Sequence, residues 1–215
     1  MAVVEERPQA PVAAPIADPA PLGLAGFGVT TLILSVFNAQ ILSGQGLPIV
    51  FGMALAYGGL AQLLAGMWEF RNNNTFGATA FTSYGAFWLS YWALVQFFLK
   101  DIKGDAGNAI GLYLIAWGIF TTYMWVASFG VSGAVNLVFV LLATTFYLLG
   151  IGEWSGHENI AKAGGYVGLA TAAAALYTSF AVVTNATFKR TVLPTFPFTR
   201  PLAQRVPRTR GAVVQ

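Results

Sequence analysis

Four long stretches of this chain contain no charged residue, and they constrain the fold more than any other feature. They cover residues 19–68, 72–99, 106–152 and 163–188. A helix needs about 20 apolar residues to cross the hydrocarbon core of a bilayer. The two longer stretches therefore hold two crossings each, and the two shorter ones hold one each. Because backbone polar groups inside a bilayer must be satisfied within the protein, the sequence predicts an all-α integral membrane protein with six transmembrane helices.

Glycine-rich turn sequences at 43–46 and 130–133 break the two longer stretches. The resulting predicted spans are 22–42, 47–70, 76–99, 109–129, 132–152 and 162–185. The domain prediction is a disordered tail at 1–17, a six-helix membrane domain at 18–188 and a basic tail at 189–215. The first tail is acidic and precedes any apolar segment, which does not fit a signal peptide.

Basic residues predict the orientation of the spans. With the N-terminus in the cytosol, eight basic residues lie on the inner side and three on the outer side. The inner set is Arg7, Arg71, Lys189, Arg190, Arg200, Arg205, Arg208 and Arg210, and the outer set is Lys100, Lys103 and Lys162. The positive-inside rule therefore predicts a multi-pass protein of the inner or plasma membrane with both termini in the cytoplasm.

Composition excludes several classes of chemistry. The chain has no cysteine and one histidine, His157, which excludes thiol chemistry and makes a metal centre or bound cofactor unexpected. The chain lacks a Ser-His pair with obvious spacing and a phosphate-binding loop, so the sequence does not suggest an enzyme. No lysine within a span could carry retinal. The net charge of +3 comes mostly from the tails, so no nucleic-acid partner is expected.

Three predicted helices each carry a mildly polar stripe at helical spacing. The stripes are Phe27, Thr31, Leu34 and Asn38; Gly58, Gln62, Gly66 and Glu69; and Thr171, Thr178 and Asn185. Polar side chains in hydrocarbon face either a wet path or a neighbouring helix to which they hydrogen-bond. We favour a path lined by Thr31, Asn38, Gln62 and Thr178, while hydrogen bonding between helices is the structural alternative for each residue.

Several ordered motifs resemble the acetate uptake transporter family, the succinate-acetate permeases. They are DPAPLGL at 18–24 followed by Gly26-Phe27, YGGLAQ at 57–62, NTFG at 74–77, AFTSYG at 80–85 and RTVLP at 190–194. The resemblance runs from about residue 18 to 194. It implies transport of acetate, with succinate as a further substrate, by a ring-shaped homo-hexamer with one pore in each protomer. It also implies that Phe27, Tyr84 and Leu142 form an apolar constriction in that pore.

The absence of Lys and Arg from the predicted spans fits such a substrate. A fixed positive charge would hold an anion tightly, whereas amide and hydroxyl groups can replace water around a small carboxylate and release it. Glu69, which continues the Gln62 face, is the candidate proton relay; Glu153 and His157 are better explained as interfacial charges. A proton-coupled symporter and an uncoupled anion channel both remain open at this point.

Three further points remain open. Asp18 stands where the family usually has Asn, so it either carries a proton, lies off the path, or makes transport slower or differently selective. A weak sequence similarity between residues 81–84 and 177–180 suggests two inverted three-helix halves. An ammonium exporter, known among fungal members, and a membrane sensor that transports nothing are the alternative functions.

Overall fold

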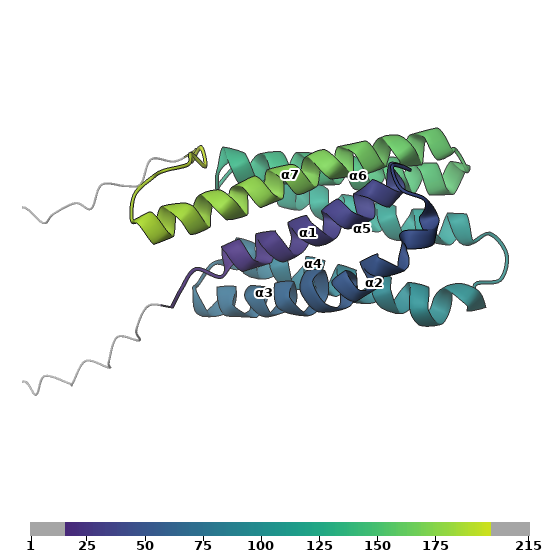
Figure 1. Ribbon diagram of the computed structural model, residues 1–215, viewed down its shortest axis with the longest axis horizontal. Coiled ribbons are helices and arrows are strands. Elements are labelled where there is room, and N and C mark those ends of the chain that lie inside the picture. The colour runs from purple at the N-terminus through teal and green to yellow at the C-terminus, as the bar shows by residue number, and fades with distance from the viewer. Residues whose placement is uncertain (1–15, 199–215) are drawn as a thin grey trace, which may run out of the picture.

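The computed structural model describes residues 16–198, and every regular element within that range is helical. Six long helical segments lie side by side along one axis (Figure 1). The predicted tails at 1–17 and 189–215 lie outside the described residues except for 16–17 and 189–198. The elements are α1 (Ala20–Asn38), η1 (Gly44–Gly46), α2 (Pro48–Leu55), η2 (Ala56–Ala61), α3 (Gln62–Arg71), α4 (Thr75–Ala93), η3 (Leu94–Phe98), η4 (Leu99–Asp101), α5 (Ala106–Ser128), α6 (Gly133–Ser155) and α7 (Glu158–Phe188).

The prediction of six helical segments is confirmed, and five of them are long and apolar enough to cross a bilayer. These five are Ala20–Asn38, Gly44–Arg71, Ala106–Ser128, Gly133–Ser155 and Glu158–Phe188. The remaining segment begins with α4, whose sequence mixes Ser, Thr, Tyr and Trp with its apolar residues. Its large aromatic side chains Phe81, Tyr84, Phe87 and Trp88 are buried, so α4 directs its apolar surface mainly into the bundle.

Short polar side chains mark several helix starts. Asp18 Oδ1 accepts the N–H of Ala20 at 2.9 Å, although the N-cap position of α1 is Pro19. At the start of α4, Asn74 Oδ1 accepts the N–H of Gly77 at 3.1 Å. Such bonds satisfy N–H groups that have no partner within the helix.

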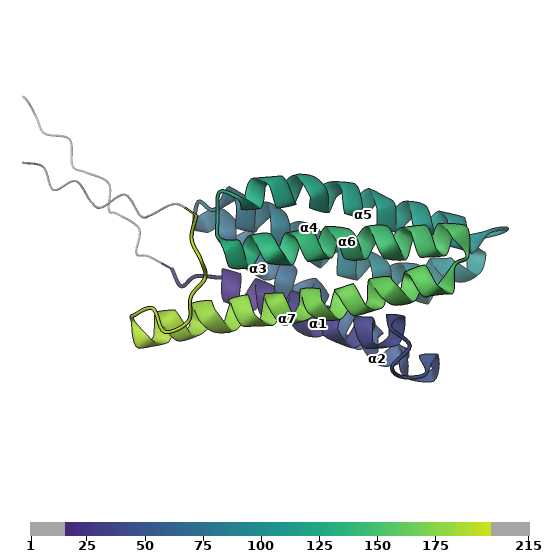
Figure 2. The same ribbon diagram turned by 90° about the horizontal axis from the view of Figure 1, so that it is seen from above.

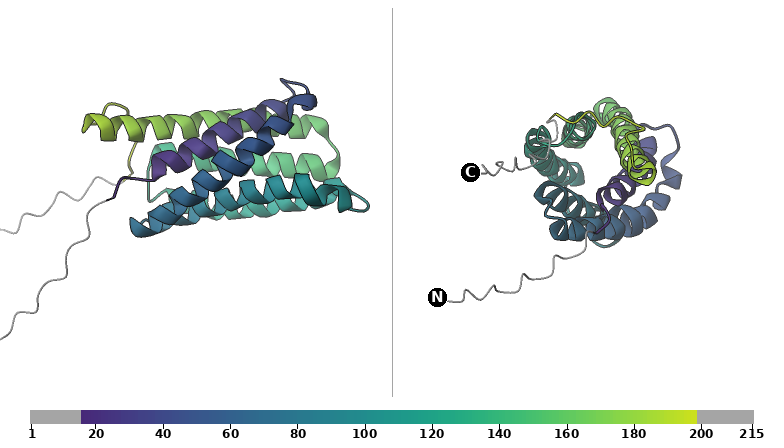
Figure 3. Two further views of the ribbon diagram at one scale, coloured as in Figure 1. Left: turned by 60° about the horizontal axis from the view of Figure 1, so that its bottom comes forward. Right: turned by 90° about the vertical axis from the view of Figure 1, so that its left-hand side faces the viewer.

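The helices form a closed ring when the bundle is viewed along its length (Figure 3, right). α1 packs between α7 and α3, α7 packs on α6, and α6 packs on α5. Figure 2 shows α5, α6 and α7 following one another in this order. α4 meets α5 largely through aromatic rings, with centroids 6.1 Å apart for Tyr84 and Trp117 and 5.8 Å apart for Phe87 and Tyr113. Large side chains therefore separate these two helices.

Both described ends of the chain lie at one end of the bundle (Figure 1). We call this the terminal end, because α1 begins there at Ala20 and α7 finishes there at Phe188. The opposite end, which holds η1 and the connection between η4 and α5, is called the loop end.

Glycines let two pairs of helices approach to backbone contact, as expected for a membrane bundle. A Cβ placed on Gly26 of α1 would lie 2.7 Å from the carbonyl oxygen of Tyr57. A Cβ placed on Gly165 of α7 would lie 2.5 Å from the carbonyl carbon of Asn38. These two contacts bring α1 against η2 on one side and against α7 on the other.

The second long segment contains a π-helical turn, η2, that the sequence did not predict. It spans Ala56–Ala61 and includes the buried residues Gly58 and Gly59. A π turn inserts an extra residue into the helical repeat and is frequent at functional sites. The next residue, Gln62, is almost completely buried, with 1% of its surface exposed.

After α7 the chain folds back across the terminal end. Asn185 Oδ1 accepts the N–H groups of Val192 and Leu193 at 2.7 and 3.0 Å. The carbonyl of Phe196 accepts the N–H of Gly133 at 2.7 Å, which gives the first residue of α6 a hydrogen-bond partner. The described part of the predicted C-terminal tail therefore packs on the membrane domain.

Candidate functional site: two cavities and a constriction

Two internal cavities lie in line along the bundle. The wide cavity, of about 290 Å³, lies toward the loop end and is lined by side chains of α1, α4, α5 and α6 together with Leu47 and residues of η3 and η4. The narrow cavity, of about 20 Å³, lies toward the terminal end and is lined by side chains of α1, α3, α4 and α6. The residues of the narrow cavity are Leu24, Phe27, Gln62, Ala80, Phe81, Tyr84, Val138, Phe139 and Leu142.

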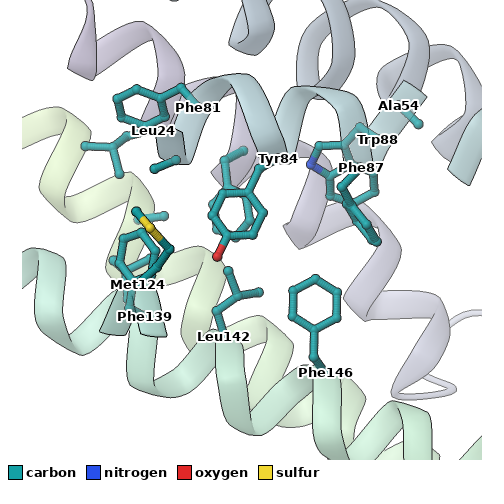
Figure 4. Packing of buried hydrophobic residues seen from close by; sticks show 14 of the residues in the cluster. Leu24, Ala54, Phe81, Tyr84, Phe87, Trp88, Met124, Phe139, Leu142 and Phe146 are labelled. Carbon is teal, nitrogen blue, oxygen red and sulfur yellow. The ribbon is translucent and has the colours of Figure 1, made fainter. Parts of the chain in front are cut away.

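Phe27 and Leu142 line both cavities, so they lie where the cavities adjoin. Tyr84 lines the narrow cavity, and its ring centroid is 5.8 Å from that of Phe27. Figure 4 shows the Tyr84 ring and the Leu142 side chain pointing toward one another across the interior. All three side chains are at most 4% exposed. The structure thus brings together the three residues that the family resemblance named, on three different helices.

The polar residues predicted to line a path are divided between the cavities. Thr31 and Asn38 of α1 border the wide cavity, and Gln62 of α3 borders the narrow one. Thr31 Oγ1 and Gln62 Oε1 are buried and accept no hydrogen bond from any described residue. Buried polar atoms are usually paired, so these two atoms are exceptions among the buried polar groups that border the cavities.

The charge of the cavities fits the prediction from the sequence. Among the described residues that line them, none is Lys or Arg, and the one carboxyl group belongs to Glu153 at the loop end of the wide cavity. An anion inside would therefore contact hydroxyl, amide and aromatic groups rather than a fixed positive charge.

Glu69 is fully buried but borders neither cavity. Its carboxylate lies against the first turn of α4, where a Cβ on Gly77 would be 2.7 Å from it. Neither carboxylate oxygen has a hydrogen bond of good geometry to a described residue, and the neighbouring amide side chains are those of Asn72 and Asn74. Glu69 thus lies near the terminal end, beside the narrow cavity's helices rather than in its wall.

Thr178 is placed apart from the other predicted residues. It is buried on α7, where its hydroxyl donates to the carbonyl of Ala174 at 2.7 Å. It lines a third cavity, between α6 and α7, together with Leu137 and Leu141. No residue of α7 lines either cavity at the constriction, so the path that we propose below does not include Thr178.

The aromatic wall of the wide cavity was not predicted from the sequence. Trp88 and Tyr91 of α4 and Tyr113 of α5 line it. The signal was available, because Tyr84, Trp88 and Tyr91 follow one another at helical intervals of four and three.

Two named proteins are similar to this chain over most of its length. The succinate-acetate/proton symporter SatP of Escherichia coli K12 is 43% identical over 183 residues, which cover 83% of this chain and 95% of that protein. Ammonia transport outward protein 2 of Saccharomyces cerevisiae is 42% identical over 199 residues, which cover 88% of this chain and 69% of the yeast protein. Both relatives are thus named as transport proteins.

The solved structure of the bacterial acetate channel SatP has the same fold. It matches with a TM-score of 0.78 and 41% sequence identity, over 84% of this chain and 99% of that one. The model of the GPR1/FUN34/yaaH family matches residues 4–200. This helical multi-pass membrane protein therefore belongs to the GPR1/FUN34/yaaH family, which confirms the family resemblance seen in its motifs.

Proposed function

We propose that this protein carries acetate, and more slowly succinate, across the membrane along a path through each protomer. The path runs from the wide cavity, between Phe27, Tyr84 and Leu142, into the narrow cavity. The observation that carries the proposal is that the two cavities adjoin at Phe27 and Leu142. The names of the Escherichia coli symporter and of the solved acetate channel support the choice of substrate.

The chemistry of the path suits a small monocarboxylate. Hydroxyl and amide groups of Thr31, Asn38 and Gln62 can replace part of the hydration shell of a carboxylate on either side of the constriction. The constriction itself is apolar and excludes water, while it admits the methyl group of acetate. A second carboxylate, as in succinate, adds a desolvation cost at this point, because no cation in the wall offsets the charge.

Glu69 is our proposed proton relay for a symport mechanism. A buried carboxylate without a cation partner is costly in its charged form, so proton binding from the terminal end would neutralise it. An uncoupled anion channel needs no such step. Uptake measured with and without an imposed pH gradient, in the wild type and in Glu69→Gln, separates the two mechanisms.

Ammonium export is the second candidate function, because the yeast relative is named for outward ammonia transport. The aromatic wall formed by Trp88, Tyr91 and Tyr113 offers π faces to a cation. Glu153 lies at the same cavity. Ammonium efflux from loaded proteoliposomes that competes with acetate would favour this function over acetate transport.

The experiment that tests the proposed function is radiolabelled acetate uptake into proteoliposomes, corrected for leak of acetic acid. Gln62→Leu keeps the side-chain volume but removes the amide, so we expect roughly a tenfold lower acetate flux. The matched control is Gln96→Leu, because Gln96 belongs to η3 and lines neither cavity. Equal flux in wild type, both variants and empty liposomes would rule out acetate transport.

We further propose that both termini are cytoplasmic and that the protomers assemble as a homo-hexamer. Eight of the eleven basic residues belong in sequence to the two tails or to the connection at Arg71, which supports the orientation. The first three-helix half begins at the terminal end with α1 and the second begins at the loop end with α5, an arrangement that an inverted repeat requires. Native mass spectrometry of the detergent-solubilised protein measures the number of protomers.

The absence of cysteine allows a direct test of orientation. Single cysteines are introduced by Ser43→Cys at the loop end and Thr191→Cys at the terminal end, where both side chains are exposed. In intact cells, a membrane-impermeant maleimide is expected to label Ser43→Cys alone, and Thr191→Cys only after lysis. The reverse labelling pattern would show that the termini lie outside the cell and contradict the proposed orientation.

A further inference from the structure

Thr121 of α5 forms a hydrogen bond with the Tyr84 side chain at the constriction. The Tyr84 hydroxyl lies 3.0 Å from Thr121 Oγ1 of α5, and Thr121 is completely buried. Thr121 Oγ1 also donates to the carbonyl of Trp117 at 2.7 Å. A hydroxyl has one proton, and that of Thr121 is used in this bond, so Tyr84 must be the donor in the bond between the two side chains.

This bond ties the polar end of Tyr84 to α5. Thr121 lines neither the wide nor the narrow cavity, whereas Tyr84 lines the narrow one. The Tyr84 ring is also held by neighbours on α5 and α6, with centroid distances of 5.4 Å to Phe120 and 6.0 Å to Phe139. A solute at the constriction therefore meets the ring of Tyr84, while the hydroxyl is bound within the wall.

We propose that Thr121 is a positioning residue for transport: by accepting a hydrogen bond from the Tyr84 hydroxyl, it keeps this ring against α5 and the constriction open and apolar. The inference rests on the proposed function. Without the acceptor, the buried hydroxyl would have to find another partner. The aromatic rings of Trp117, Phe120 and Phe139 close the other directions, so the hydroxyl would move toward the cavity and narrow the passage.

A double-mutant cycle tests the role of this bond. Thr121→Val removes the acceptor at nearly constant volume, Tyr84→Phe removes the donor but keeps the ring, and Thr121→Ser restores an acceptor. We expect Thr121→Val to lower acetate flux by about fivefold, whereas Tyr84→Phe changes it by no more than about twofold. Because a Phe ring has no hydroxyl to relocate, adding Tyr84→Phe to Thr121→Val is expected to restore the flux, as is Thr121→Ser.

The chain offers a matched control one residue further along α5. Thr122 Oγ1 likewise donates to a carbonyl within its own helix, that of Gly118, and lies 3.0 Å from a tyrosine hydroxyl, that of Tyr147. Neither Thr122 nor Tyr147 lines the two cavities. Thr122→Val breaks an equivalent pair away from the path, so it is expected to leave the acetate flux unchanged.

The outcomes separate the inference from the proposed function. If Thr121→Val lowers flux equally with and without Tyr84→Phe, or does not lower it at all, Thr121 does not act through Tyr84 and the positioning role is wrong. If Thr122→Val lowers flux as much as Thr121→Val, the effect is one of general packing and again contradicts the inference. Absence of acetate flux in the wild type would overturn the proposed function, and the positioning role with it.

Discussion

Tyr84→Ala is expected to fuse the wide and narrow cavities and to abolish much of the selectivity of the path. The substitution removes the ring that borders the constriction beside Phe27 and Leu142. We expect succinate flux relative to acetate flux to rise by about tenfold, because the wider, wetter passage lowers the desolvation cost of the second carboxylate. The measurement is paired uptake of the two labelled acids in proteoliposomes.

The control for Tyr84→Ala is the same substitution at Tyr123, whose side chain is 53% exposed on α5. Truncation of a buried aromatic side chain also costs stability, about 3–5 kcal/mol in soluble proteins. A thermal melt of each variant in detergent therefore accompanies the uptake measurement. An unchanged succinate-to-acetate ratio in folded Tyr84→Ala protein would exclude Tyr84 from the constriction.

Gly165→Ala is expected to disrupt the crossing of α1 and α7. Its new methyl group would lie 2.5 Å from the carbonyl carbon of Asn38, which is a backbone atom and has no rotamer that relieves the overlap. Overpacking of this kind typically costs about 1–3 kcal/mol and sometimes more. We expect the midpoint of thermal unfolding to fall sharply, or the protein to aggregate on size-exclusion chromatography.

Gly52→Ala is the matched control for this substitution. It places the same methyl group on a helical glycine where, apart from the adjacent residues and the backbone of its own helix, no atom of the protomer lies within 4 Å. There the higher helix propensity of Ala should leave stability equal or slightly increased. If Gly165→Ala and Gly52→Ala unfold at the same temperature as the wild type, the close packing of α1 on α7 is not essential to the fold.

The number of helices could be predicted from the sequence because charge is costly inside a bilayer. The exact helix ends could not, since charges mark the membrane boundary rather than the end of a helix. The last span was predicted at 162–185, yet α7 runs from Glu158 to Phe188 and includes Lys162. The first was predicted to reach residue 42, but α1 ends at Asn38, and Gln40 then adopts a positive φ of 56°.

The polar stripe on α7 shows why a site is harder to predict than a helix. Thr171, Thr178 and Asn185 share a face, but each has a different partner. The Thr171 hydroxyl lies 3.2 Å from that of Thr145, Thr178 bonds within its own helix, and Asn185 binds the returning C-terminal segment. Helical spacing tells which residues share a face, but not which neighbour that face meets.

The constriction residues were predicted from the family resemblance rather than from helical spacing. Phe27, Tyr84 and Leu142 lie on three helices, and by composition alone each one resembles an ordinary core residue. The bond from Tyr84 to Thr121 joins α4 to α5 across 37 residues of sequence, so no local signal could indicate it. Such contacts depend on how the helices are arranged in the bundle.

The most direct test of whether acetate passes between Phe27, Tyr84 and Leu142 is the accessibility of residue 142 from the path. In this cysteine-free chain, Leu142→Cys places one thiol at the junction of the cavities, and Thr144→Cys places one on the exposed face of the same helix. We expect a small charged methanethiosulfonate to block acetate flux through Leu142→Cys, to act more slowly when acetate is present, and to leave Thr144→Cys unaffected. Full acetate flux through Leu142→Cys protein whose modification is verified by mass spectrometry would show that acetate does not pass between Phe27, Tyr84 and Leu142.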